Sequence, residues 1–177
     1  MLNIERGLAS AIRLLVLDVD GVLTTSHLVL GRDGEEIKFF SVKDGIAIKF
    51  AQHAGIEVAF LSARTSTIVE RRAETLGVSR VHQGIHAKLK RVAEMTEELG
   101  IEFRNVAYVG DDIVDIEPLE AVGFGVAVAD SCSDVLARIS NVADAKGGSG
   151  AIREVVEAIL KARGDWDTVV AEYIAKA

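Results

Sequence analysis

Cysteine, proline and aromatic residues are scarce in this chain, and long apolar runs are missing. The sequence has one cysteine and one proline in 177 residues, and 5% of its residues are aromatic. A lone cysteine excludes an internal disulfide, which suits a reducing compartment. We interpret Cys132 as structural, because no histidine pattern accompanies it. No apolar run approaches the roughly 20 residues that a membrane-spanning helix needs, so we expect no membrane partner.

Basic residues are also fewer than acidic residues. The chain has 20 Lys and Arg against 27 Asp and Glu, a net charge of −7. No basic stripe could follow a polyanion, so we expect no nucleic-acid binding. Residues 2–10 include Glu5 and Arg6 and lack the apolar centre of a signal peptide, so we expect a cytoplasmic protein. With 49% hydrophobic residues, the chain suits a single domain over residues 1–177.

Apolar segments alternate with helical patterns along most of the chain. This rhythm favours an α/β fold, a doubly wound parallel sheet in three layers built from βαβ units. Strands are expected at Leu14–Leu17, Glu57–Leu61, Val81–His82, Val106–Val109 and Phe124–Ala127, with Val142–Ala143 as a further candidate. Helices are expected at about Gly45–His53, Thr67–Leu76, His86–Leu99, Ile113–Ala121, Asp134–Ile139 and Ala151–Arg163.

Two segments depart from this rhythm. The apolar arms Leu28–Leu30 and Ile37–Phe40 flank Gly31–Gly34, a β-hairpin signal over residues 28–40. An isolated hairpin is marginal in water, so its apolar arms either fold over their own domain or form a subunit interface. The last segment, residues 164–177, is polar with one tryptophan. We expect a short terminal helix or a frayed tail there, with low order unless it docks on a neighbour.

Acidic residues follow the first expected strand. Asp18 and Asp20 come directly after Leu14–Leu17, at the carboxyl end where open α/β sheets bind ligands. Paired carboxylates repel a bare phosphate, but a divalent cation would reverse that repulsion. Further polar groups follow later elements in chain order, namely Ser62, Lys88, Asp111, Asp112 and Asp115. The sequence therefore indicates a phosphoryl-transfer site.

Each residue type has a task in that chemistry. Asp18, an anion at neutral pH, would attack phosphorus and form an aspartyl-phosphate. Asp20 would give a proton to the leaving oxygen and later take one from water. The Ser62 hydroxyl and the Lys88 ammonium would hold the phosphoryl oxygens.

The second acidic cluster would serve a metal. Asp111 would supply a hard oxygen beside Asp18 to a divalent ion, and Mg²⁺ is the best candidate. Asp112 and Asp115 would form the outer shell of the metal and hold the loop. Taken singly, each motif has an ordinary structural explanation as a helix cap, a turn or a solvated side chain. The ordered set is far more specific than its parts.

The ordered set resembles the haloacid dehalogenase superfamily of phosphohydrolases, from Leu14 to about Leu160. The resemblance implies the same roles for Asp18, Asp20, Ser62 and Lys88, and it adds the Asp20 backbone carbonyl as a metal ligand beside Asp18 and Asp111. The intervals before and after Ser62 leave no room for the substrate-selecting cap domain of many members. A capless enzyme still has to exclude water, so we expect a neighbouring subunit to act as the lid.

Five stretches are similar to a capless subgroup that hydrolyses keto-deoxy sugar acid phosphates: Asp18–Thr24, Phe40–Gly45, Gly110–Asp115, Val126–Asp130 and Gly147–Glu154. The subgroup implies a homotetramer in which hairpins meet centrally and each tail reaches a neighbour's site. It also implies substrate contacts at Asp20, Ser41, Val42, Lys43, Asp44, Gly45, Lys49, Arg64, Arg72 and Lys88. The cations among them suit a sugar acid with a carboxylate and a phosphate.

Departures from the subgroup bear on the substrate. Lys43 and Lys49 stand where arginines are frequent, which weakens bidentate carboxylate recognition. Ser149 occupies a position that often carries an arginine. Arg64 favours an eight-carbon over a nine-carbon sugar acid, because the nine-carbon branch tends to have glutamate there. The expected activity is a Mg²⁺-dependent phosphatase for an eight-carbon keto-deoxy sugar acid phosphate.

Other activities stay open at this stage. The nine-carbon sugar acid phosphate or another small phosphate ester is an alternative substrate. A phosphorylation-switched receiver domain uses similar groups, but its lysine comes last in the chain, whereas Lys88 precedes the second acidic cluster. A non-catalytic relative that only binds or oligomerises is the remaining alternative, although every catalytic position holds the required residue type.

Overall fold

A parallel sheet forms the centre of the computed structural model, which describes residues 2–176. Its five strands follow the order β5-β4-β1-β6-β7. The strands are β1 (Leu14–Leu17), β4 (Glu57–Leu61), β5 (Arg80–His82), β6 (Val106–Gly110) and β7 (Phe124–Ala127). The expected strands are thus confirmed to within one residue at each end. Val142 forms only an isolated β-bridge with Ala127, so the further candidate strand Val142–Ala143 is wrong.

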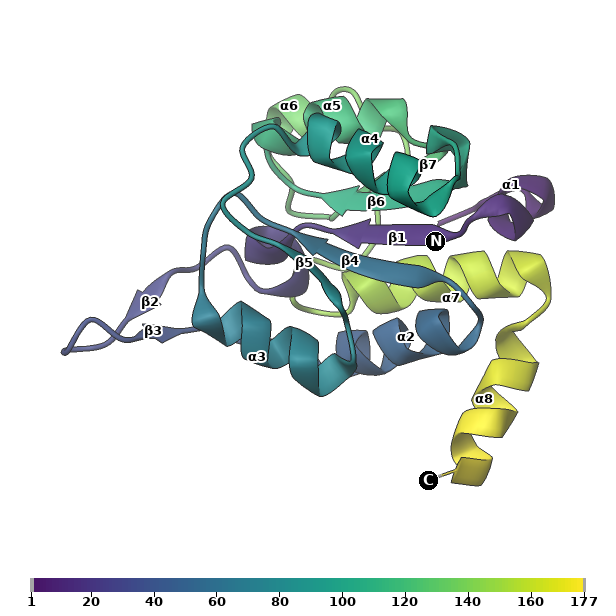
Figure 1. The fold of residues 1–177 in the computed structure, drawn as a ribbon, viewed down its shortest axis with the longest axis horizontal. Coiled ribbons are helices and arrows are strands. Elements are labelled where there is room, and N and C mark those ends of the chain that lie inside the picture. Colours follow the sequence, from purple (N-terminus) through teal and green to yellow (C-terminus); the bar gives the residue numbers. More distant parts are fainter. Residues whose placement is uncertain (1, 177) are drawn as a thin grey trace.

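Helices cover both faces of the sheet (Figure 1). One layer holds α4, α5 and α6, and the other holds α2, α3 and α7. The helices are α1 (Arg6–Ala11), α2 (Val42–His53), α3 (Thr67–Leu76), α4 (Lys88–Leu99), α5 (Ile116–Ala121), α6 (Ser133–Leu136), α7 (Ala151–Arg163) and α8 (Trp166–Lys176). Single turns of other helix types lie at Val19–Leu23, Phe103–Asn105 and Ile113–Asp115. The three-layer, doubly wound architecture is confirmed.

The inner strands are largely apolar because both faces of the sheet are buried there, whereas the edge strand β5 carries Arg80 and His82 and is partly exposed. In β1, Leu14 and Val16 face the α4 and α5 layer, whereas Leu15 and Leu17 face the α2 and α7 layer. All four side chains are fully buried. Polar residues that follow β1, β4 and β6 therefore lie together at the edge of the sheet where the carboxyl ends of these strands meet.

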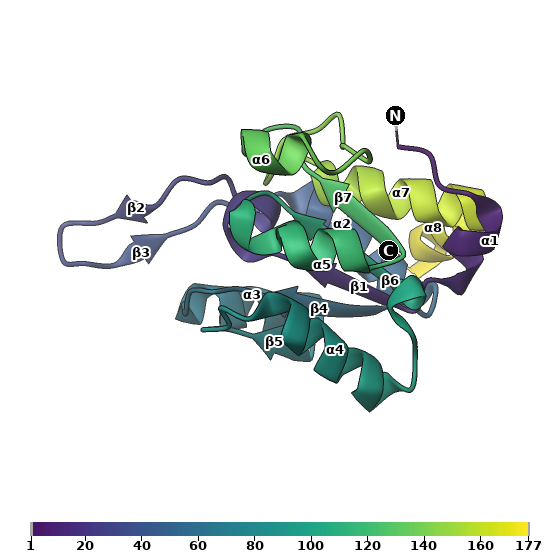
Figure 2. The same cartoon turned by 90° about the horizontal axis from the view of Figure 1, so that it is seen from above.

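The hairpin projects from that same edge (Figure 2). It is shorter than the sequence indicated, with β2 (Val29–Leu30) paired to β3 (Glu36–Ile37) and a bridge from Thr24 to Phe40 at its base. Its arms are exposed, and the side chains of Leu30 and Phe39 are each 63% accessible. Within the described residues, therefore, the arms do not fold over their own domain.

The C-terminal segment is ordered against the rest of the chain. Trp166 and Tyr173 of α8 contact Phe50 of α2 edge to face, with ring centroids 5.6 and 5.0 Å apart. The Arg153 guanidinium lies 4.8 Å from the Trp166 ring centroid. Of the two alternatives expected for this segment, the short terminal helix is confirmed, and α8 docks on its own chain through Trp166, Val169 and Tyr173. Among the described helices, none combines the length and the apolar character that crossing a membrane requires.

Candidate active site

A cavity of about 180 Å³ opens at the carboxyl ends of β1, β4 and β6. It brings together residues that are far apart in the sequence but that all follow strands or begin helices. The lining consists of Asp18, Asp20, Ser62, Ala63, Arg64, Lys88, Asp111, Asp112, Val114 and Asp115. The catalytic and metal residues expected from the sequence thus lie at one place.

Asp18 stands at the end of β1, where the chain turns sharply. Its amide donates to the Val109 carbonyl at 3.0 Å, which fixes the carboxyl end of the strand. Gly21 in the following turn has φ +104°, and a Cβ there would lie 2.0 Å from Asp111 Oδ2. Only glycine allows this conformation and this approach without strain. The Asp18–Val19–Asp20–Gly21 turn can therefore pack directly against the second acidic loop.

Lys88 joins the two acidic loops. Its Nζ donates to Asp18 Oδ1 at 2.5 Å and to Asp115 Oδ1 at 2.7 Å, and the residue is 3% exposed. Burial disfavours the charged form of Lys88, but the charges of Asp18 and Asp115 outweigh it and raise the pKa of Lys88. The ammonium therefore stays charged next to the cavity.

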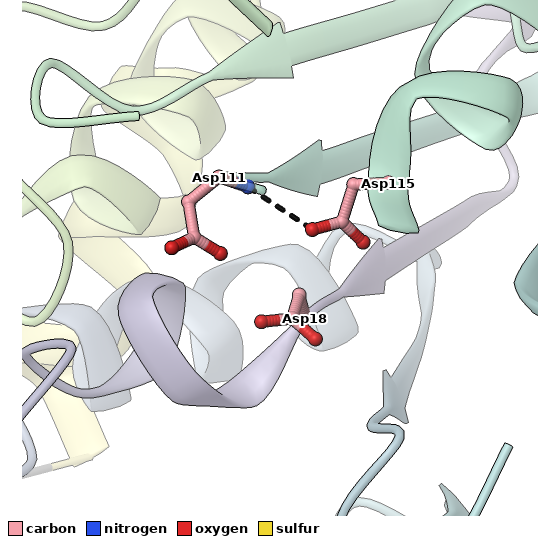
Figure 3. Close-up of side chains that lie close together, drawn as sticks. All are labelled: Asp18, Asp111 and Asp115. Carbon is pink, nitrogen blue, oxygen red and sulfur yellow. Dashed lines mark hydrogen bonds between the residues drawn. The ribbon is translucent and has the colours of Figure 1, made fainter. Parts of the chain in front are cut away.

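Asp115 is an anchor for the site. Besides Lys88, its oxygens accept from the Tyr108 hydroxyl at 2.6 Å and from the amides of Asp111 and Asp112 at 3.1 and 3.3 Å. A Cβ at Gly110 would lie 2.5 Å from Asp115 Cβ, so the loop needs glycine there. Asp115 thereby fixes the backbone that carries Asp111 (Figure 3).

Ser62 and Arg64 follow β4 and form the opposite wall. Ser62 is 3% exposed, and its Oγ accepts from the Arg64 amide at 3.1 Å. No acceptor among the described residues takes the Ser62 hydroxyl proton in a hydrogen bond. That proton is available for a ligand oxygen in the cavity.

The hairpin reaches the cavity through two side chains that sequence reasoning missed. Lys38 Nζ forms an ion pair with Asp20 Oδ1, and it lies 3.2 Å from Glu36 Oε1. Glu36 also accepts from Arg64 Nη2 at 3.0 Å and from Ser66 Oγ at 2.6 Å. Their charges gave no signal, because alternating charged residues in a hairpin arm usually face solvent.

Tyr108 was missed for a different reason. It lies in β6 and is fully buried, and a buried tyrosine needs a partner for its hydroxyl. That requirement, in the strand before Gly110–Asp111, was a usable signal for a contact with the acidic cluster. Burial, followed by the charge of Asp115, raises the pKa of Tyr108 well above its ordinary value. The hydroxyl therefore acts as a donor.

Most of the expected substrate contacts do not line the cavity. Asp44 is buried, and its oxygens accept from the amides of Gly150 and Arg153 at 3.1 and 2.8 Å. Arg72 donates to the Ser41 carbonyl at 3.2 Å and lies over the Phe40 ring. These residues brace the loop before α2, where Ser41 caps the helix by accepting from the Asp44 amide at 3.2 Å.

The other expected contacts also lie outside the cavity lining: Val42, Lys43, Gly45 and Lys49. Gly45 is buried beside Arg72, whereas the side chain of Val42 is 74% accessible and the two lysines are exposed. Their contact with a substrate stays a prediction.

Comparison with known proteins identifies the family. A model described as haloacid dehalogenase-like hydrolase matches residues 80–155. The 3-deoxy-D-manno-octulosonate 8-phosphate phosphatase KdsC of Escherichia coli (strain K12) is 45% identical over 159 residues, 90% of this chain and 85% of that enzyme. The chain belongs to the haloacid dehalogenase-like hydrolases.

Solved structures of this family extend the likeness to the fold. The phosphatase of Moraxella catarrhalis, crystallised with magnesium, phosphate and KDO, matches with a TM-score of 0.91 and 37% identity, over 95% of this chain and 97% of that one. The cobalt-bound enzyme of Haemophilus influenzae matches with a TM-score of 0.85 and 38% identity, over 89% and 92% of the two chains. The fold of this chain is therefore that of haloacid dehalogenase-like phosphatases.

This haloacid dehalogenase-like chain has no cap domain within its described residues. Only the hairpin, α2 and β4 separate Asp20 from Ser62, and only α3 and β5 separate Ser62 from Lys88. In the described chain, Lys38 and Glu36 of the hairpin segment contact two residues of the cavity lining, Asp20 and Arg64.

The acidic cluster of this hydrolase fits a magnesium ion. Asp18, Asp111 and Asp115 each offer an oxygen within 4.8 Å of the others. Burial, then the charge of Asp115, raises the pKa of Asp18 to about 7, so the expectation of a fully ionised Asp18 at neutral pH is wrong for the site without a cation. Burial, then the charge of Asp18, raises the pKa of Asp111 to about 8. A buried group of carboxylates that destabilise one another gains most from a divalent cation with oxygen ligands.

Proposed function

We propose that this chain is a Mg²⁺-dependent phosphatase that hydrolyses 3-deoxy-D-manno-octulosonate 8-phosphate to 3-deoxy-D-manno-octulosonate and phosphate. The observation that carries the proposal is the Lys88 ammonium held between Asp18 and Asp115 beside Asp111. The relatives named above supply the substrate class, since one is a phosphatase of this sugar acid phosphate and another was crystallised with the sugar acid itself.

The first half of the reaction uses Asp18 and Asp20. An Asp18 carboxylate oxygen attacks phosphorus and forms an aspartyl-phosphate, while the ester bond between phosphorus and the sugar oxygen breaks. Asp20 gives its proton to that leaving oxygen. Lys88 and the Ser62 hydroxyl hold the phosphoryl oxygens, which carry the negative charge.

The second half releases phosphate. Water attacks the aspartyl-phosphate, Asp20 takes the proton of that water, and the bond between Asp18 and phosphorus breaks. Asp18, Asp111 and the Asp20 backbone carbonyl would hold magnesium, and Asp112 and Asp115 would support that site through the loop they share. When bound, magnesium neutralises negative charge between Asp18 and the phosphate, so that one anion can approach another.

The cavity walls bear on the choice of sugar acid. Arg64 lines the cavity and is held by Glu36, so a cation stands beside the phosphate position. This favours a substrate with a second anionic group, such as the eight-carbon sugar acid. The nine-carbon sugar acid phosphate is the second candidate, and direct comparison of the two decides between them.

Phosphate release from purified protein tests the function. We expect turnover of 3-deoxy-D-manno-octulosonate 8-phosphate with Mg²⁺, its loss in EDTA, and a lower kcat/KM for the nine-carbon analogue and for simple sugar phosphates. A chain that binds the phosphate ester without hydrolysing it would be the non-catalytic alternative. A stable phosphorylated protein without turnover would indicate a receiver domain.

We further propose that the protein acts as a homotetramer in the cytoplasm. The exposed apolar side chains of the hairpin, Leu28, Leu30, Ile37 and Phe39, support assembly through this element, because apolar patches of this kind mark interfaces. Light scattering tests the oligomeric state, and cell fractionation tests the location.

A further inference from the structure

We propose that Lys38 is a positioning residue for Asp20, so that the hairpin completes the acid–base group of its own subunit's active site. The inference rests on the proposed phosphatase function and adds a residue to it. Lys38 is not part of the ordered motif set that identified the site. It belongs to the segment between β3 and α2, 18 residues from Asp20.

Lys38 is buried where it meets Asp20. Its side chain is 3% exposed, whereas the Asp20 side chain is 28% exposed toward the cavity. A lysine with a free end in water gains little from an exposed pair, since screening and side-chain entropy cancel the attraction. A buried ammonium must instead be paired, and Asp20 and Glu36 are its partners. The position of Lys38 is therefore fixed by its surroundings.

The pairing distinguishes the two oxygens of Asp20. Lys38 engages Oδ1, and no donor in the described part of the chain engages Oδ2 in a hydrogen bond. The ion pair commits one oxygen of the carboxylate to Lys38 and leaves Oδ2 as the oxygen available to a ligand in the cavity that Asp20 lines. That oxygen carries the proton to the leaving group when the ester bond between phosphorus and oxygen breaks, and it takes the proton of water afterwards.

Glu36 holds Lys38 in turn. It accepts from Ser66 Oγ at 2.6 Å and from Arg64 Nη2 at 3.0 Å, and both partners belong to the loop after Ser62. Ser66 and Arg64 thus tie the hairpin to the wall of the cavity through a single carboxylate. The segment that carries Lys38 cannot shift without breaking these contacts. The hairpin, Asp20 and the phosphate-binding loop therefore form one unit.

Leaving groups of different basicity test the assignment. An alkoxide from a sugar phosphate needs a proton as it departs, whereas p-nitrophenolate does not. We expect Lys38→Met to lower the rate of leaving-group release in the first turnover, at saturating substrate, by about ten- to a hundredfold for 3-deoxy-D-manno-octulosonate 8-phosphate, part of the 10²–10⁴ that general acid catalysis supplies. For p-nitrophenyl phosphate that loss should stay under about threefold, because hydrolysis of the aspartyl-phosphate, which also uses Asp20, comes after the leaving group has departed. The half-saturating concentration should be unchanged for both substrates.

Companion variants separate positioning from folding. Lys38→Arg should recover most of the activity on the sugar phosphate, and Glu36→Gln should show a weaker form of the same selective loss. Lys90→Met removes an exposed lysine from α4 and should leave both activities unchanged. Equal losses in the first-turnover rate on both substrates would assign Lys38 a purely structural role and overturn the proposal. A raised half-saturating concentration with an unchanged first-turnover rate would make Lys38 a substrate contact and overturn it as well.

The test of Lys38 can fail independently of the proposed substrate. If the wild type hydrolyses a different alkyl phosphate, the octulosonate assignment fails, and the ratio of alkyl to aryl activity still decides the role of Lys38. A wild type that hydrolyses p-nitrophenyl phosphate and no alkyl phosphate would overturn both.

Discussion

At the scale of single residues, the number of hydrogen-bond donors around each carboxylate distinguishes the roles of the acidic residues in the site. In the described part of the chain, Asp18, Asp111 and Asp115 lie close together, and the Lys88 ammonium pairs with two of them, Asp18 and Asp115. Buried charges are stable only when they are paired or hydrogen-bonded. Asp115 meets this condition through four donors, whereas Asp18 and Asp111 have raised pKa values. The two carboxylates left short of partners are those that we expect to bind the metal.

Replacing Asp18 by asparagine should remove turnover and keep the fold. A neutral amide cannot attack phosphorus, so we expect kcat to fall by at least about a thousandfold, or roughly 4 kcal/mol in the barrier. Lys88 keeps Asp115 as its partner, so circular dichroism and thermal unfolding should resemble the wild type. Asp134→Asn, at an exposed position, serves as the control. Activity retained in Asp18→Asn would exclude Asp18 as the nucleophile.

Tyr108→Phe tests the anchor rather than the chemistry. The variant removes a hydrogen bond to the charged Asp115, and such bonds contribute about 1.5–3 kcal/mol. We expect urea denaturation to show a loss of that order, with kcat reduced less than tenfold because the other donors still hold Asp115. Tyr173→Phe removes the hydroxyl of a more exposed tyrosine and should change neither quantity. An unchanged stability of Tyr108→Phe would contradict the anchoring role.

The hairpin has two roles at the scale of elements. Its base supplies Lys38 and Glu36 to the site, while its arms expose Leu30 and Phe39. A two-stranded ribbon is rarely stable alone, so the apolar arms need a partner. The sequence predicted the hairpin but made its strands too long, because apolar residues near the base, such as Phe39, do not pair in the ladder.

Leu30→Ser together with Phe39→Ser should weaken the oligomer. Both side chains are 63% accessible, and polar replacements remove the apolar area that an interface would bury. We expect light scattering to show a smaller species and turnover to fall, since the proposed homotetramer would lose the neighbouring subunit that we expect to exclude water from the site. Leu136→Ser, which changes an exposed leucine of α6, should leave the mass unchanged. A fully active monomer would refute the idea of a shared site.

At the scale of the whole molecule, the sequence predicted the positions of those site residues that directly follow a strand of the sheet. Asp18, Ser62 and Asp111 were placed together correctly, because the carboxyl ends of parallel strands meet at one edge. The sequence did not predict the hydrogen bond that Asp44 accepts from the amide of Arg153, because the two residues are 109 positions apart and no local pattern indicates the contact. Such contacts depend on how distant loops pack, which is a property of the folded chain rather than of any segment.

Magnesium and pH should act on the stability of the whole molecule together. The pKa of Asp18 is about 7 and that of Asp111 about 8 in the folded chain, against 3.8 ordinarily. Between pH 3.8 and about 8, the folded chain holds more protons on Asp18 and Asp111 than the unfolded chain does. The free energy of unfolding therefore falls as pH rises from about 4 to about 8. Each proton contributes at most about 1.4 kcal/mol per pH unit.

Magnesium should reverse that loss, because it binds the deprotonated carboxylates. In EDTA we expect urea denaturation to show stability decreasing between pH 5 and 8. With Mg²⁺ the profile should be flatter, so that the gain from the metal grows with pH. The pKa values of Glu36 and Glu157 are lowered in the folded chain, so these carboxylates change the free energy of unfolding only below about pH 4.5. They do not contribute to the slope between pH 5 and 8. Asp111→Asn should flatten the profile in EDTA and reduce the gain from Mg²⁺. A gain that is constant with pH would mean that the metal binds elsewhere than at these two carboxylates.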